Sequence, residues 1–141
     1  MFMTSFNFVE TPNTSSKVID TITLTTNEYL SFPTFFVEKH KLKSLGQDLF
    51  ARLYFDRQQN AVAIQFVTEK SAGLYKINVS PQYGATCKVK AFLSNNEIDA
   101  GKYTGKYEYT KHTADEVGLE GGDVYIMKLK SRAGDADGGD M

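Results

Sequence analysis

Lysines and tyrosines alternate in one short stretch of the second half of the chain, and together such side chains can bind nucleic acid. Residues 102–110 read KYTGKYEYT, so an extended conformation places Tyr103 and Tyr107 on one face and Lys102 and Lys106 on the other. Tyrosine rings can stack on unpaired bases while lysines neutralise phosphates. We therefore predict that these four residues contact nucleic acid. The alternative interpretation, which the strict alternation favours, is a half-buried strand with tyrosines inward and lysines outward.

Four further lysines lie in or beside two expected short helices. Lys39 and Lys41 fall in the first helix, and Lys88 and Lys90 immediately precede the second. We predict that all four contact phosphates, whose neutralisation dominates the affinity of proteins for nucleic acid. The net charge of −1 and the sequence pI of about 6.1 are compatible with this role but do not indicate it, because strong binders are usually more basic.

No enzyme signature accompanies these lysines. The sequence has no phosphate-binding loop, GxGxxG, HExxH or GxSxG motif, so we expect no catalysis and no cofactor. His40 stands among charged residues and is expected on a solvated helix face, and His112 on a solvated loop. Cys87 alternates with Val89 and is expected to be a buried thiol. We also expect no metal site, because the acids of loop 111–123 lack the spacing of an EF-hand: Asp115, Glu116, Glu120 and Asp123.

Residues 22–67 predict a complete unit of strand, short helix and hairpin. Ile22, Leu24, Leu30 and Phe32 occupy even positions, which is typical of a half-buried strand. Pro33 then favours the start of a helix that should run to about residue 42. Two β-rich runs follow at 49–55 and 61–67, and the polar residues between them indicate a hairpin loop.

The same order of elements recurs later in the chain, although the identity between the two units is low. We expect strands, a helix and two further strands at residues 74–79, 86–90, 91–98, 102–110 and 124–130. Phe36 then corresponds to Phe92 or Leu93, and Leu42 to Ile98, at an offset of about 56 residues that grows to about 63 towards the end. In the long loop 111–123, the spacing from Thr113 to Glu116 matches a capping box and predicts one helical turn.

These patterns predict a fold that is mainly β with short helices. Two pseudo-repeated strand-helix-hairpin units, residues 21–70 and 71–132, should pack into one small barrel-like domain. Residues 1–20 are expected to form an N-terminal arm rich in phenylalanine, and residues 133–141 a disordered acidic tail. The chain has no secretory signal, no apolar run long enough for a membrane span and a single cysteine, so we expect a cytoplasmic protein that does not enter the membrane.

The first unit resembles the swapped-hairpin DNA-binding domain of the AbrB, SpoVT and MazE families. Residues 30–33, Leu-Ser-Phe-Pro, match the step of these families into a short helix, residues 37–42 the helix, 45–48 the Gly-centred break and 49–67 the hairpin. The resemblance implies DNA binding by a barrel of two such units. Those families carry arginine and lysine around the first strand, where this chain has Thr21, Thr23 and Thr25. We therefore expect the second unit to supply most phosphate contacts.

Two functions follow as expectations. The first is a non-enzymatic, nucleic-acid-binding regulator of AbrB-like type whose lysines contact phosphates. The alternative is a structural or assembly protein, such as a viral or phage accessory subunit, that acts through protein-protein contacts. In that case the aromatic residues Phe2, Phe6 and Phe8 of the N-terminal arm would bind a partner or another copy of the chain.

Overall fold

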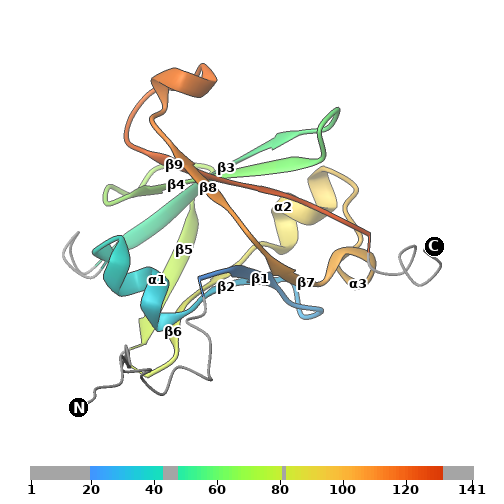
Figure 1. Ribbon diagram of the computed structural model, residues 1–141, viewed down its shortest axis with the longest axis horizontal. Coiled ribbons are helices and arrows are strands. Elements are labelled where there is room, and N and C mark those ends of the chain that lie inside the picture. Colours follow the sequence, from blue (N-terminus) through green and yellow to red (C-terminus); the bar gives the residue numbers. More distant parts are fainter. Residues whose placement is uncertain (1–19, 43–47, 81, 132–141) are drawn as a thin grey trace, which may run out of the picture.

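Nine strands form a single sheet in the computed structural model, which describes residues 20–42, 48–80 and 82–131 (Figure 1). The first half contains β1 (Ile22–Leu24), β2 (Tyr29–Phe32), α1 (Thr34–Lys39), β3 (Leu49–Asp56) and β4 (Ala61–Val67). The second half contains β5 (Tyr75–Ser80), β6 (Gly84–Lys88), α2 (Lys90–Asn95), α3 (Ala100–Tyr103), β7 (Gly105–Tyr107), β8 (Thr110–His112), η2 (Asp115–Val117) and β9 (Val124–Lys128). The predicted fold class is confirmed. The predicted arm, apart from Asp20, and the predicted acidic tail lie outside the described residues.

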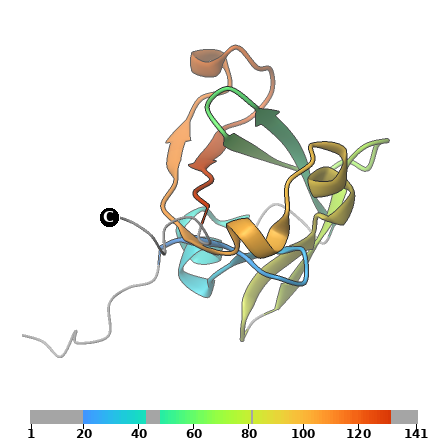
Figure 2. The ribbon, with the colours of Figure 1, turned by 90° about the vertical axis from the view of Figure 1, so that its right-hand side faces the viewer.

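The sheet curls until the strands at its two ends belong to one chain segment. Its order is β7-β1-β2-β6-β5-β3-β4-β9-β8, with antiparallel pairing throughout. Only Glu108 and Tyr109 separate β7 from β8. One bent segment therefore pairs with β1 through its first part and with β9 through its second. Figure 2 shows β8 beside β9 on one side of the barrel-like body. The two ends of the sheet are therefore joined by this segment, although β7 and β8 each pair with only one strand of the described chain.

The strand pairings are related by a two-fold symmetry that exchanges the two halves of the chain. β2 and β6 are each the second strand of their own half, and they pair with each other. β4 and β9 are each the last strand of their own half, and they also pair with each other. β3 of the first half corresponds to β7 of the second, and β1 corresponds to β5. The pairing of β3 with β5 is therefore equivalent to the pairing of β7 with β1. An approximate two-fold axis therefore passes between Ser31 and Thr86 on one side of the barrel, and between Ala63 and Ile126 on the other. The predicted pseudo-repeat is present in the topology.

The short helices α1 and α2 end in the same way. Each has six residues, and Lys41 and Glu97, which follow their C-caps, both adopt left-handed backbone with φ of 56° and 59°. The chain then turns inward and buries Leu42 and Ile98, the pair that the repeat matched. α1 is shorter than expected. It ends at Lys39, because the left-handed backbone at Lys41 cannot continue a helix.

The predicted strand at residues 102–110 is wrong in its first part. Ala100–Tyr103 forms the short helix α3, and the Asp99 side chain caps it by accepting a hydrogen bond from the Gly101 N–H at 3.0 Å. Such a cap stabilises a helical turn, which overrides the alternation of the residues that follow. Lys102 and Tyr103 therefore lie on a helix, and only Gly105–Tyr107 and Thr110–His112 are strands.

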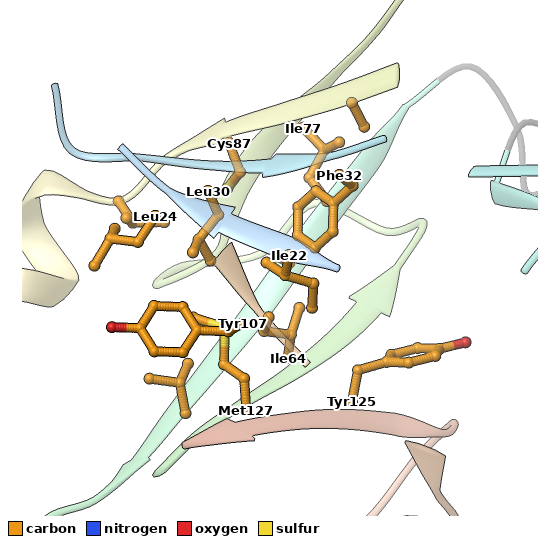
Figure 3. Close-up of a cluster of buried hydrophobic side chains, with 14 of the residues drawn as sticks. Ile22, Leu24, Leu30, Phe32, Ile64, Ile77, Cys87, Tyr107, Tyr125 and Met127 are labelled. Carbon is orange, nitrogen blue, oxygen red and sulfur yellow. The ribbon is translucent and has the colours of Figure 1, made fainter. Parts of the chain in front are cut away.

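Apolar side chains from both halves fill the interior (Figure 3). Ile22, Leu24, Leu30 and Phe32 are at most 2% exposed, as the alternating pattern predicted. Full burial of such a side chain contributes roughly 1.5–3 kcal/mol, so each of these inward residues stabilises the fold. None of the helices in the described parts of the chain is long and apolar enough to cross a membrane.

The long loop between β8 and β9 is held by a buried amide. Gln65 of β4 is 1% exposed, and its Nε2 donates to the backbone carbonyls of Glu120 and Gly122, at 2.8 Å in both cases. At the start of the loop, the Thr113 N–H donates to Glu116 and the Glu116 N–H donates to Thr113 Oγ1. This capping box confirms the predicted turn, η2, which projects at the top of Figure 1.

Candidate nucleic-acid interface

Two of the predicted lysines line one open groove beside α2, which we call the α2 groove. Lys88 ends β6 and Lys90 begins α2, so the step from strand to helix brings both to the same surface. The groove has a volume of about 580 Å³, and no carboxylate is among the side chains that line it. Its lining residues are Tyr75, Lys88, Lys90, Ala91, Ser94 and Asn95.

Both lysines of the α2 groove are available to bind an anion. They are exposed, and neither makes an ion pair within the described residues. Lys88 Nζ lies 5.7 Å from the centre of the Tyr29 ring, a cation-π contact worth roughly 0.5–1 kcal/mol at an exposed site. Such a contact orients the ammonium group without occupying its hydrogen-bond donors. The groove therefore combines two cations with an aromatic ring, a hydroxyl and an amide, which together can contact both phosphate and base.

The lysine-tyrosine stretch at residues 102–110 is divided between exposed and buried positions. Lys102 Nζ lies 5.7 Å from the centre of the half-buried Tyr103 ring on α3, and Lys106 is exposed on β7. Tyr107 is 3% exposed, and its hydroxyl hydrogen-bonds to the backbone of Tyr103 and Lys130. This burial leaves no ring face open to a base, which contradicts the predicted stacking role of Tyr107. The inward alternative holds for this residue.

A second basic groove, which sequence reasoning missed, lies between the bent segment and β9. Its lining includes Lys106, Lys128 and Lys130, with Glu108 as the one acid. Lys128 and Lys130 are exposed and form no ion pair with any described residue. A signal was present in the sequence, because these two lysines alternate with apolar residues of the closing strand, and period-two reasoning places them on the outer face.

Lys39 and Lys41 lie apart from the other predicted contacts. Lys39 ends α1 and Lys41 follows its C-cap, and α1 lies across the molecule from α2 and α3 (Figure 1). Lys39 Nζ is 2.9 Å from Asp20 Oδ2, so part of its charge is already neutralised. The structure therefore does not bring the lysines of the two helices together, and the larger group belongs to the second half.

A chain of hydrogen bonds lies where the end of α1 meets the bent segment. The Tyr109 hydroxyl donates to Asp20 Oδ1 at 2.6 Å, and His40 Nε2 lies 2.7 Å from the same hydroxyl. Because the hydroxyl proton goes to Asp20, His40 must donate from Nε2. His40 is half-buried, with ring centroids 4.5 Å from Phe36 and 4.7 Å from Tyr125. The expected solvated position of His40 is therefore wrong, because Tyr109 and Tyr125, distant in sequence, pack against it.

The environment fixes the charge state of this cluster at neutral pH. Burial lowers the pKa of His40, and the positive charges of Lys111 and Lys39 lower it further. Burial raises the pKa of Tyr109, and its hydrogen bond to Asp20 adds to this effect. Burial also acts to raise the pKa of Asp20, but hydrogen bonds from Tyr109 and Lys39 outweigh it and lower the pKa overall. Asp20 is therefore ionised, Tyr109 is protonated and His40 is neutral.

The remaining candidate residues carry no visible site. Cys87 is fully buried, as predicted, and burial raises the pKa of its thiol to about 12, which makes it a poor nucleophile. His112 Nε2 forms a hydrogen bond with the Thr110 hydroxyl at 2.9 Å. Among the residues that the structure describes, no group of three or more His, Cys, Asp or Glu side chains is placed to hold a metal ion.

Comparison of the chain with protein-family models, with curated proteins and with solved structures found no match. The resemblance of the first unit to the swapped-hairpin families therefore stays a prediction. A fold shared with such families would not establish a function in any case. The function has to be argued from the side chains and charges of the α2 groove.

Proposed function

We propose that this protein binds nucleic acid through the α2 groove, as a non-enzymatic regulator. One observation carries the proposal: Lys88 and Lys90 share an open groove that contains a tyrosine, a serine and an asparagine but no carboxylate. Unpaired lysines in a surface groove neutralise phosphates, and the polar and aromatic groups between them are the types that contact bases and sugars.

The distribution of charge in the second half supports this proposal. Residues 71–131 contain eight lysines and seven acids, and four of those acids lie in the loop between His112 and Val124. That loop projects from the barrel (Figure 1). The surface formed by the strands and helices of the second half is therefore more basic than the net charge indicates, which favours the approach of a polyanion.

The proposal is tested by fluorescence anisotropy with labelled random-sequence DNA, offered both as single strands and as duplex. We expect binding at low ionic strength that weakens steadily as salt rises. Lys88→Ala/Lys90→Ala should weaken binding and reduce its dependence on salt. A charge-matched control, Arg52→Ala/Lys70→Ala, removes two exposed cations of the first half that are outside the groove and should have little effect. If neither the single strands nor the duplex bind at low salt, the proposal is refuted.

The alternative function, assembly through the N-terminal aromatic arm, stays a prediction because that arm lies almost wholly outside the described residues. We also propose that this regulator acts in the cytoplasm.

A further inference from the structure

We infer that the nucleic acid bound in the α2 groove is single-stranded. This inference rests on the proposed function and names the form of its ligand. It follows from three features of the molecule: the charge difference between its two equivalent halves, the shape of the elements that carry cations, and the side chains of the groove itself.

The two halves share a fold but do not share basic positions. Lys90 is the first residue of α2, and the first residue of α1 is Thr34. Lys128 is the fifth residue of β9, and the fifth residue of β4 is the buried Gln65. A protein that reads a palindromic duplex places equivalent contacts on both sides of its two-fold axis, so that each half meets one half-site. This chain has the axis without the equivalent cations, and it therefore suits a ligand that lacks two-fold symmetry.

Neither α2 nor the β5–β6 and β3–β4 hairpins offer unpaired cations in a shape that can enter a duplex groove. The major groove accepts an α-helix or a two-stranded ribbon, but α2 has only six residues and packs Phe92 and Leu93 into the core. The β5–β6 hairpin has no lysine at its turn, and Lys76 at its base is paired with Asp48 at 3.1 Å. At the turn of the β3–β4 hairpin, Arg57 lies 3.8 Å from Glu97.

The α2 groove instead has the composition of a single-strand site. Such sites combine lysines that follow the phosphates with aromatic groups that contact unpaired bases. Tyr75 is half-buried, with its ring centroid 6.5 Å from that of Phe92, and its exposed part lines the same groove as Lys88 and Lys90. Ser94 and Asn95 of α2 supply hydrogen-bonding groups. The groove is shallow and open to solvent, so a base without a pairing partner can reach the side chains that line it.

The experiment compares fluorescein-labelled oligo(dT), oligo(rU) and a mixed-sequence duplex of equal length by anisotropy, using the full chain. We expect at least one single strand to bind about tenfold more tightly than the duplex. The oligo(dT) and oligo(rU) arms distinguish DNA from RNA as the source of the strand. Lys88→Ala/Lys90→Ala should reduce the salt dependence by about 1.4 in log-log slope, since each phosphate contact to a single strand contributes about 0.7. Arg52→Ala/Lys70→Ala should retain the wild-type slope.

The outcomes distinguish failure of the single-strand inference from failure of the proposed nucleic-acid binding. Duplex binding that equals or exceeds single-strand binding, and that still depends on Lys88 and Lys90, would overturn the inference and keep the function. Absence of binding to all three probes would overturn both. Equal losses in the two double variants would show that the α2 groove is not the site, and would also overturn the inference.

Discussion

The two halves of the molecule have the same architecture and different outer surfaces. In the first half, Lys39 is paired with Asp20 at 2.9 Å, and Arg57 lies 3.8 Å from Glu97. In the second half, a larger set of exposed lysines has no ion pair among the described residues: Lys88, Lys90, Lys102, Lys128 and Lys130. The inward positions of both halves are apolar because they share one core. The outward positions have no such constraint. Arg52 and Lys70 of the first half are also exposed without an ion pair among the described residues, but the larger set of such cations lies on the second half.

The strand that closes the barrel differs between the halves as well. β3 runs unbroken over eight residues, whereas its counterpart is split into β7 and β8 of three residues each. The break contains Tyr109, whose hydroxyl is thereby able to join Asp20 and His40. The break in the repeat thus places a residue of the second half in a polar cluster with Asp20 and His40 of the first half.

The largest effect is expected at Gly84, where β6 of the second half lies against the end of β2 in the first half. A Cβ on Gly84 would overlap the carbonyl oxygen of Phe32, and its φ of 91° is strained for other residues. Gly84→Ala should therefore destabilise the protein by more than about 3 kcal/mol, the sum of backbone strain and overpacking. Urea unfolding followed by circular dichroism measures this loss.

Gly73→Ala is the matched control for that variant. Gly73 has a similar φ of 83°, but nothing lies within 4 Å of the position of its Cβ. Its substitution should cost only the strain of left-handed backbone, about 1–2 kcal/mol. Equal costs for the two variants would contradict the close contact between β6 and the end of β2.

A smaller effect is expected from cutting the chain between the halves. Residues 68–73 are exposed, so a protease site inserted between Lys70 and Ser71 should be tolerated. The pairings β1–β7, β2–β6, β3–β5 and β4–β9 all join one half to the other. After cleavage the two pieces should therefore still elute together in native buffer, and their stability should become dependent on concentration. Separation of the pieces without denaturant would show that the halves pack side by side and do not interlock.

Short sequence patterns predicted the inward residues of the first strands and the start of the first helix. Alternation identified Ile22, Leu24, Leu30 and Phe32 as inward residues, and Pro33 marked the change from strand to helix. The same reasoning failed at residues 102–110, where a cap from Asp99 and a break in the sheet interrupt a clean alternation.

The candidate sites were less predictable, because they depend on contacts between distant residues. The charged neighbours of His40 indicated solvent, but its position is set by Tyr109, which lies 69 residues further along the chain. The pairing of Lys39 with Asp20, and the sharing of one groove by Tyr75 and Lys90, likewise arise only once the sheet has closed.

The smallest effect concerns His40, whose counterpart at the C-cap of α2 is Asn96. The groups that face His40 include Asp20, Lys39 and Lys111, and burial with the two lysines lowers the pKa of His40 below 6.5. The unfolded chain therefore binds the proton more readily than the folded chain does, so stability should decrease as pH falls through 6.5 towards the folded-state pKa. Thermal melts at pH 7.5 and 5.5 measure this decrease. The contribution of Asp20, whose pKa is also lowered, is lost only at a more acidic pH, below its ordinary 3.8.

His40→Asn gives the first half the residue that the second half already has. Asn96 Nδ2 donates to the Phe92 carbonyl at 2.9 Å, so an asparagine at position 40 should bond back to its own helix and release the Tyr109 hydroxyl. We expect a loss of about 1 kcal/mol at pH 7.5 from the missing hydrogen bond, together with a weaker dependence on pH between 7.5 and 5.5. An unchanged dependence on pH in this variant would mean that His40 does not titrate in that range. The polar cluster would then act only as a packing contact between α1 and the bent segment.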